Sequence, residues 1–205
     1  MSDLADVALR DVRTLLARAY TDDPLMVWIF PDERSRPDAV AAWLGLFVEH
    51  YLNYGHVDTV ATDRLEAVAV WRMPDQPAPG AVADSRPTLP TVPGLLTAMV
   101  GAERASAIGD GLATIRELTP EQPYAYLQFL AVDPDLRRRG RGRQVLEAGL
   151  RRAGRSEVGV HLETMNEENL GFYRRLGFEV SGERQLAPDG PTTWAMWADP
   201  AGLPG

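Results

Sequence analysis

The sequence predicts a mixed β-sheet with helices on both faces, in the α/β or α+β class. Three observations lead there: helical periodicity in the first 54 residues, a hairpin pattern after them, and alternating strand-like and helix-like segments from residue 124 onward. The chain has 205 residues, and 45% of them are hydrophobic. This is enough for a sizeable core, so we expect one domain spanning residues 1–205.

The N-terminal part has the pattern of three helices. The first should be capped by Ser2 or Asp6 and end at Asp22-Asp-Pro24. A short apolar helix over 25–30 and a longer one over 36–54 should follow. Gly55 comes directly after the long helix, where we expect a left-handed stop. The apolar side of the first helix consists of Leu9, Val12, Leu15, Leu16 and Ala19.

Two strands over 57–61 and 65–71, joined by a short polar turn, read as a hairpin. Residues 73–93 are rich in Pro, Gly and Ala, which favours a long loop. Residues 95–118 have helical spacing, with interruptions expected at Gly101 and at 109–111, so this segment should form two helices.

The last third alternates between strands and helices. Gly149 should let the helix that contains it approach the sheet closely, and Gly177 should stop the next helix. The expected order is strand 124–132, helix 141–153, strand 158–162, helix 166–176, and strands 178–181 and 192–197.

Composition excludes several classes of function. The chain has no Cys, which excludes a disulfide scaffold, a thiolate zinc site and a Cys nucleophile. His50, His56 and His161 lack metal-ligand spacing, so we expect no metal site. The net charge of −8 disfavours a nucleic-acid surface. The N-terminus lacks the apolar region of a signal peptide and every apolar run is too short for a bilayer, so a soluble, cytoplasmic protein without a membrane partner is expected.

The most informative segment joins the strand 124–132 to the following helix. Asp133-Pro134 makes a turn, and the loop Arg137-Arg-Arg-Gly-Arg-Gly142 opens the helix. Gly140 and Gly142 let backbone approach a ligand, and the free N–H groups of the helix start attract anions. The loop therefore predicts a pyrophosphate site, with a solvated Arg-rich turn and a nucleic-acid patch as alternatives. Its basic residues are Arg137, Arg138, Arg139, Arg141 and Arg143.

Two motifs carry a family resemblance. Arg137, Gly140 and Gly142 match the pattern Gln/Arg-x-x-Gly-x-Gly/Ala, and residues 162–178 match a second motif in the right order. The chain thus resembles the GNAT superfamily of N-acetyltransferases, most specifically over residues 124–180. Within it, the chain is similar to the puromycin N-acetyltransferases, except that little sequence precedes the first helix, where the family usually has a strand. The segments behind that closer likeness are Asp22-Asp-Pro24, Ala67-Val-Ala-Val-Trp71, Leu162-Glu-Thr164, Asn169-Leu170, Phe172-Tyr173 and Thr193-Trp194.

The resemblance implies a mostly antiparallel sheet whose strands 129–132 and 158–162 splay apart, with acetyl-CoA as acyl donor and its pantetheine arm in the gap. Leu130, Ala131 and Val132 would bind that arm, and the Leu130 N–H would polarise the thioester carbonyl. The alternative is that these residues only form core.

Further roles follow from the same resemblance. Tyr173 would be the general acid, and Glu163 is the candidate general base. The alternative for Tyr173 is a packed aromatic, and the alternative for Glu163 is a structural carboxylate. Asn169 and Asn166 share a helical face with Tyr173 and would bond the cofactor arm, while Asn166 is equally suited to an N-cap.

Carboxylates and aromatics would suit a cationic amine acceptor. The candidates are Asp22, Asp23, Trp28, Phe30, Tyr51 and Trp71. Core packing is the alternative, and the favoured one, for most of the aromatics, and a helix end is the alternative for the two aspartates. The expected function is acetyl transfer to a small-molecule primary amine, by direct attack in a ternary complex because no Cys is available. A different acyl donor, a protein N-terminus as acceptor and a non-catalytic acyl-CoA sensor are alternatives. The oligomeric state stays open, a homodimer included.

Overall fold

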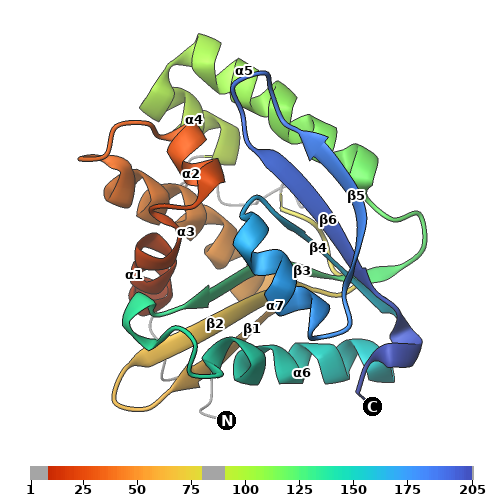
Figure 1. The fold of residues 1–205 in the computed structure, drawn as a ribbon. Helices are drawn as coiled ribbons and strands as arrows, with labels where there is room; N and C mark the ends of the chain where they lie inside the picture. Colours follow the sequence, from red (N-terminus) through yellow and green to blue (C-terminus); the bar gives the residue numbers. More distant parts are fainter. Residues whose placement is uncertain (1–8, 80–90, 205) are drawn as a thin grey trace.

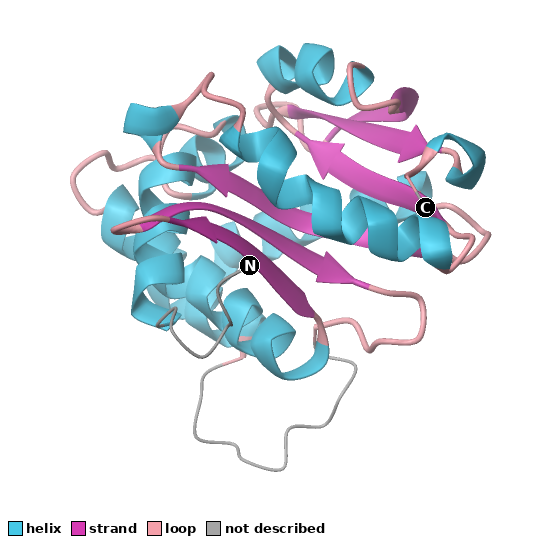
Figure 2. Cartoon of the chain, turned by 90° about the horizontal axis from the view of Figure 1, so that it is seen from below, coloured by secondary structure: helices cyan, strands magenta, loops and turns pink. Residues whose placement is uncertain are grey.

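The computed structural model describes residues 9–79 and 91–204 (Figure 1). They form a six-stranded sheet in the order β1-β2-β3-β4-β6-β5. Only β3 and β4 are parallel, and the other neighbours are antiparallel. Helices lie on both faces of the sheet (Figure 2), so the predicted fold class is confirmed. The strands are β1 (His56–Ala61), β2 (Leu65–Arg72), β3 (Tyr124–Val132), β4 (Gly159–Thr164), β5 (Glu179–Gln185) and β6 (Thr192–Ala198).

The predicted helices are present with small shifts at their ends. The helices are α1 (Leu9–Tyr20), α2 (Pro24–Ile29), α3 (Arg36–Tyr54), α4 (Val92–Val100), α5 (Ala102–Ala113), α6 (Arg141–Arg155) and α7 (Leu170–Arg174), with single 3-10 turns η2 (Thr114–Leu118), η3 (Pro134–Leu136), η4 (Glu167–Asn169) and η5 (Pro200–Gly202). The helix expected over 166–176 is thus a 3-10 turn followed by a short helix, and it ends before Gly177, whose φ is +88°. The proposed caps Ser2 and Asp6, and part of the predicted loop, lie outside the described residues.

Two glycine predictions are wrong. Gly55 is extended, with φ −126° and ψ −150°, and is not left-handed. A Cβ there would lie 2.5 Å from the Trp71 carbonyl oxygen. Glycine is therefore needed because the backbone between α3 and β1 passes close to the backbone of β2. The expected interruption at 109–111 is also absent, because α5 continues through it. Gly111 fits against the Leu186 carbonyl, 2.8 Å from where its Cβ would be, and glycine within a helix costs only about 1 kcal/mol.

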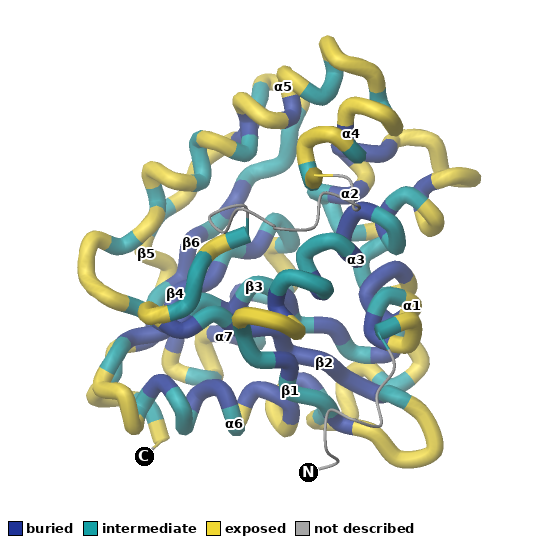
Figure 3. The backbone as a smooth tube through the Cα atoms, turned by 180° about the vertical axis from the view of Figure 1, so that it is seen from behind, coloured by how far each residue is buried: buried dark blue, intermediate teal, exposed yellow. Residues whose placement is uncertain are grey.

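Two cores cover the two faces of the sheet. One lies under α1 to α5 and includes Val68, Val70 and Phe129. The other lies under α6 and α7 and includes Trp71 and Leu127. Figure 3 shows that buried backbone gathers in β2, β3 and one side of α6, whereas β5 and the outer side of α5 are exposed. Within the described residues, no helix is long and apolar enough to span a bilayer.

Candidate active site

The strands β3 and β4 pair over only three residue pairs, the last being Tyr126 with His161. Beyond that pair β3 continues to Val132 beside β2, and β4 continues to Thr164 beside β6. The two strands therefore diverge (Figure 1), which confirms the predicted splay. Backbone groups along the diverging edges have no partner strand on this side, and at Leu130 both groups bond to the Tyr20 hydroxyl instead.

A β-bulge lies at the point of divergence. Trp71 pairs with Leu127 and Val70 pairs with Phe129, so Gln128 is the additional residue in β3. A bulge bends its strand and reverses which side chains face each side. Accordingly Leu127 belongs to the α6 core, while Phe129 belongs to the α1–α5 core. Beyond the bulge, the N–H and the carbonyl of Leu130 point toward Tyr20 in the gap.

The gap belongs to a cavity of about 1530 Å³. Ligand pockets commonly measure about 300–1,000 Å³, so this cavity can hold two substrates at once. One end is the loop before α6, and the other lies among α1, α3, α4 and α5. The diverging parts of β3 and β4 line the passage between the ends.

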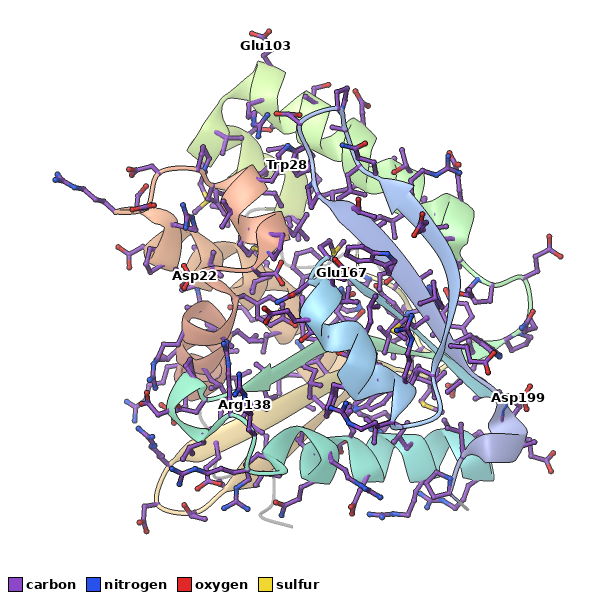
Figure 4. All side chains as sticks on the ribbon, in the orientation of Figure 1. Asp22, Trp28, Glu103, Arg138, Glu167 and Asp199 are labelled. Carbon is purple, nitrogen blue, oxygen red and sulfur yellow. The ribbon has the colours of Figure 1, made fainter. Side chains whose placement is uncertain are left out.

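The loop before α6 has the geometry of an anion site. Gly140 is left-handed, with φ +77°, and directly precedes the helix. The first intrahelical bond runs from the Gln144 N–H to the Gly140 carbonyl, so the preceding N–H groups are free. A Cβ at Gly142 would lie 3.3 Å from Phe172, which leaves little room for any larger residue. These features fit a diphosphate, and Figure 4 shows Arg138 on this loop.

The five predicted arginines differ in their surroundings. Arg138 and Arg143 line the cavity. Arg137 also lines it and donates to the Ala19 carbonyl at 3.3 Å. Arg141 is partly neutralised, because its Nε lies 2.6 Å from the buried Glu66 carboxylate. Arg139 is outside the lining, so its predicted role in cofactor binding has no support from its position.

Tyr173, Asn166 and Asn169 all line the cavity. The Tyr173 ring packs between Phe172 and Phe178, so it is both a packed aromatic and a cavity residue. Burial, and secondarily the charge of Asp23, raise the pKa of its hydroxyl well above the ordinary value, which keeps it protonated.

The two asparagines differ in what else they do. Asn166 caps η4 by accepting from the Glu168 N–H at 3.0 Å. Asn169 donates to the Thr164 hydroxyl at 3.3 Å. The cap role of Asn166 is therefore present beside its position in the cavity.

Glu163 is held by two neighbours that sequence reasoning missed. Its carboxylate accepts from the Tyr126 hydroxyl at 2.5 Å and lies 2.7 Å from Nε2 of His161. Nδ1 of His161 is buried without a partner among the described residues, so we assign the proton to Nε2. Burial, followed by the charge of Glu163, raises the pKa of Tyr126, which therefore remains a donor. The available signal was the two-residue spacing of His161 and Glu163 on one strand, which places them on one face.

The acceptor end differs from its prediction. Asp22 and Asp23 line the cavity, but none of the four predicted aromatics does. Trp71 faces the α6 core, where its indole would lie 2.1 Å from a Cβ at Gly149. This approach confirms the prediction for Gly149. Trp71 shares its face of β2 with Ala67 and Ala69, which also belong to the α6 core, so it lies away from the cavity.

The other three aromatics are engaged elsewhere. Trp28 packs under the Arg104 guanidinium at 5.3 Å, Phe30 packs on Trp43 at 6.0 Å, and Tyr51 donates to Gln128 at 2.8 Å. The apolar walls of the acceptor end are instead Leu25, Met26, Trp43, Leu44, Phe47, Leu96, Leu112 and Ile115.

The two aspartates have different environments. Asp22 is 96% exposed and lies 3.9 Å from Arg36 (Figure 4). Asp23 caps α2 by accepting from the Leu25 N–H at 2.9 Å. Burial raises the pKa of Asp23 to about 6, and no basic side chain of the described residues pairs with it. Within the described residues, no group of three or more His, Asp or Glu is arranged to hold a metal.

Comparisons with known proteins agree with this geometry. Residues 98–180 match the sequence model of the acetyltransferase (GNAT) domain. Peptidyl-lysine N-acetyltransferase YjaB of Escherichia coli is 34% identical over 61 residues, and an uncharacterized protein of Mycobacterium leprae is 38% identical over 86 residues. These matches cover 30% and 42% of this chain, but only 40% and 24% of the respective relatives.

Solved structures match over nearly the whole chain. A Corynebacterium glutamicum protein described as histone acetyltransferase HPA2 and related acetyltransferase has a TM-score of 0.69 at 24% identity, covering 97% of this chain and 93% of that one. Arylalkylamine N-acetyltransferase 2 of Aedes aegypti has a TM-score of 0.60 at 12% identity, covering 93% and 94%. These likenesses establish the fold. Residues 98–180 thus match a GNAT acetyltransferase domain, and this segment includes the splayed strands and the glycine loop at the start of α6.

Proposed function

We propose that this chain transfers the acetyl group of acetyl-CoA to a small-molecule primary amine, by direct attack in a ternary complex. The observation that carries the proposal is one cavity with two unlike ends. Arginines and a helix N-terminus form one end, carboxylates and apolar walls form the other, and Tyr173 and Glu163 line the cavity as well.

The donor end supports acetyl-CoA. Arg138, Arg143 and the free N–H groups at the start of α6 would bind the diphosphate. The unpaired edge of β3 from Leu130 to Val132 would bond the amides of the pantetheine arm. The Leu130 N–H would stabilise negative charge that develops on the thioester oxygen.

The side chains at the gap support the chemistry. The amine must lose a proton, and Glu163, held by Tyr126 and His161, would accept it directly or through water. A C–N bond then forms and the C–S bond breaks, leaving a thiolate. Tyr173 would donate to that sulfur. Its pKa is above that of a thiol, about 8.5, so Tyr173 acts chiefly as a hydrogen-bond donor to the thiolate.

The acceptor end supports an amine with one positive charge and an apolar body. Asp22, Asp23 and Glu163 line the cavity among apolar walls, and the charge of Arg18, which also lines it, is paired with Asp133 and Asp135. A carboxylate suits the ammonium group, and the walls suit an aromatic or aliphatic body. An amine of the puromycin type meets both requirements, whereas a polycationic sugar would leave charges against apolar walls.

A thiol-release assay tests the proposal. Acetyl-CoA is supplied with puromycin, tryptamine, kanamycin or a short peptide with a free N-terminus, and coenzyme A binding is measured by calorimetry. We expect coenzyme A to bind and thiol release to be fastest with puromycin or tryptamine. Binding without turnover on any amine would favour a sensor, peptide-only turnover would favour a protein acceptor, and no coenzyme A binding would refute the proposal.

A further inference from the structure

The hydroxyl of Tyr20 forms two hydrogen bonds with the backbone of Leu130 within the gap. It accepts from the Leu130 N–H at 3.2 Å and donates to the Leu130 carbonyl at 3.2 Å. Leu130 belongs to the part of β3 beyond its last pair with β4. A side chain from α1 therefore satisfies both backbone groups that the splay leaves open at this residue.

Several contacts hold Tyr20 in this position. Its ring packs edge-on against Phe129 at 6.0 Å. The end of α1 is tied to the loop before α6, because Arg137 donates to the Ala19 carbonyl at 3.3 Å and Arg18 pairs with Asp133 at 2.9 Å. Burial, then the neighbouring Tyr173 and Asp23, raise the pKa of Tyr20. Its hydroxyl is therefore protonated at any working pH and can always donate.

We propose that Tyr20 is a further catalytic residue, whose hydroxyl joins the Leu130 N–H as a second donor to the thioester oxygen. This inference rests on the proposed function. When a thioester oxygen takes the Leu130 N–H, the Tyr20 hydroxyl loses the bond that it accepts there. Its proton then turns from the Leu130 carbonyl to the incoming oxygen.

The hydrogen bonds available at the gap favour this role over simple displacement of Tyr20. A displaced phenol would be buried without a partner, and such a group costs stability. In the proposed arrangement the Tyr20 O–H and the Leu130 N–H both donate to one oxygen, while the Leu130 carbonyl can accept from an amide of the pantetheine arm. The Tyr20 hydroxyl and both backbone groups of Leu130 then keep a partner.

The test combines kinetics with the carbonyl stretch of bound acetyl-CoA labelled with 13C at the carbonyl. Loss of one such donor usually lowers kcat by about 100- to 1,000-fold. We expect Tyr20→Phe to lower kcat by about 100-fold with little change in the KM for acetyl-CoA. The infrared band of bound acetyl-CoA should shift to lower frequency in the wild-type protein and shift less in the variant. Tyr54→Phe, on an exposed tyrosine outside the cavity, is the matched control.

Two results would overturn the proposal. A lower KM with unchanged kcat would show that Tyr20 only blocks the site, and an unshifted band with unchanged kinetics would show a purely structural role. If Tyr20→Phe misfolds, fluorotyrosine at position 20 replaces it, and the more acidic hydroxyl should increase the band shift. Because the infrared band needs only binding, it remains informative if no amine is turned over, which separates this proposal from the proposed function.

Discussion

Replacing Asp23 by Asn tests for an unpaired negative charge at the acceptor end of the cavity. Burial raises the pKa of Asp23 from 3.8 to about 6. The folded state then binds the proton more tightly than the unfolded state, so stability falls as the pH rises from about 4 to about 6. Above that window the carboxylate lowers the free energy of unfolding by about 3 kcal/mol, because each pKa unit corresponds to about 1.4 kcal/mol.

Asn is as good an N-cap as Asp, so Asp23→Asn removes the charge and keeps the cap of α2. Urea unfolding at pH 8 should show that the variant's free energy of unfolding is about 2–3 kcal/mol higher than that of the wild type. This gain should vanish near pH 3.5, where the Asp23 carboxyl is mostly protonated in both the folded and the unfolded state. Asp22→Asn is the control, since that side chain is 96% exposed and its loss should change stability by less than about 0.5 kcal/mol. An equal effect of Asp23→Asn at both pH values would refute the reasoning.

The same variant should also weaken binding of the amine. If the Asp23 carboxylate holds the ammonium group, its loss should raise the KM for the acceptor about tenfold or more, as for other bonds to charged groups. The KM for acetyl-CoA should not change, because Asp23 lies at the other end of the cavity from the arginine loop. An unchanged KM for the amine would exclude this contact.

Three other variants test separate parts of the site and core. Tyr173→Phe should lower kcat by about 100-fold or more while coenzyme A affinity, measured by calorimetry, stays unchanged; full activity would exclude Tyr173 as a donor to the leaving thiolate. Arg143→Gln should weaken coenzyme A binding about tenfold, whereas Arg139→Gln, outside the cavity lining, should have little effect. Equal losses of coenzyme A affinity would show that only the total positive charge of the loop matters. Gly149→Ala should cost about 1–3 kcal/mol in urea unfolding because its Cβ would overlap the Trp71 indole, whereas Gly109→Ala meets nothing within 4 Å and should be neutral or slightly stabilising.

Much of the fold follows from local pattern. Periodicity places the helices and strands within a few residues of their observed ends. Gly101 and Gly177, both with positive φ, interrupt helical structure as expected. The splay and the positions of Tyr173 and Glu163 along the cavity agree with what the family resemblance implied. The ends of helices and strands depend on neighbours in the sequence, so local pattern alone could place them.

The tertiary structure decided which side chains share the cavity. The bulge at Gln128 reverses the faces of β3, and Trp71 on the paired strand packs under α6 outside the cavity. Tyr20 reaches Leu130 across 110 positions of the chain, and Glu66 on β2 pairs with Arg141 at the start of α6. Periodicity and capping act over a few residues, whereas these contacts depend on how distant segments pack, and that packing sets the charge and hydrogen bonding of the site.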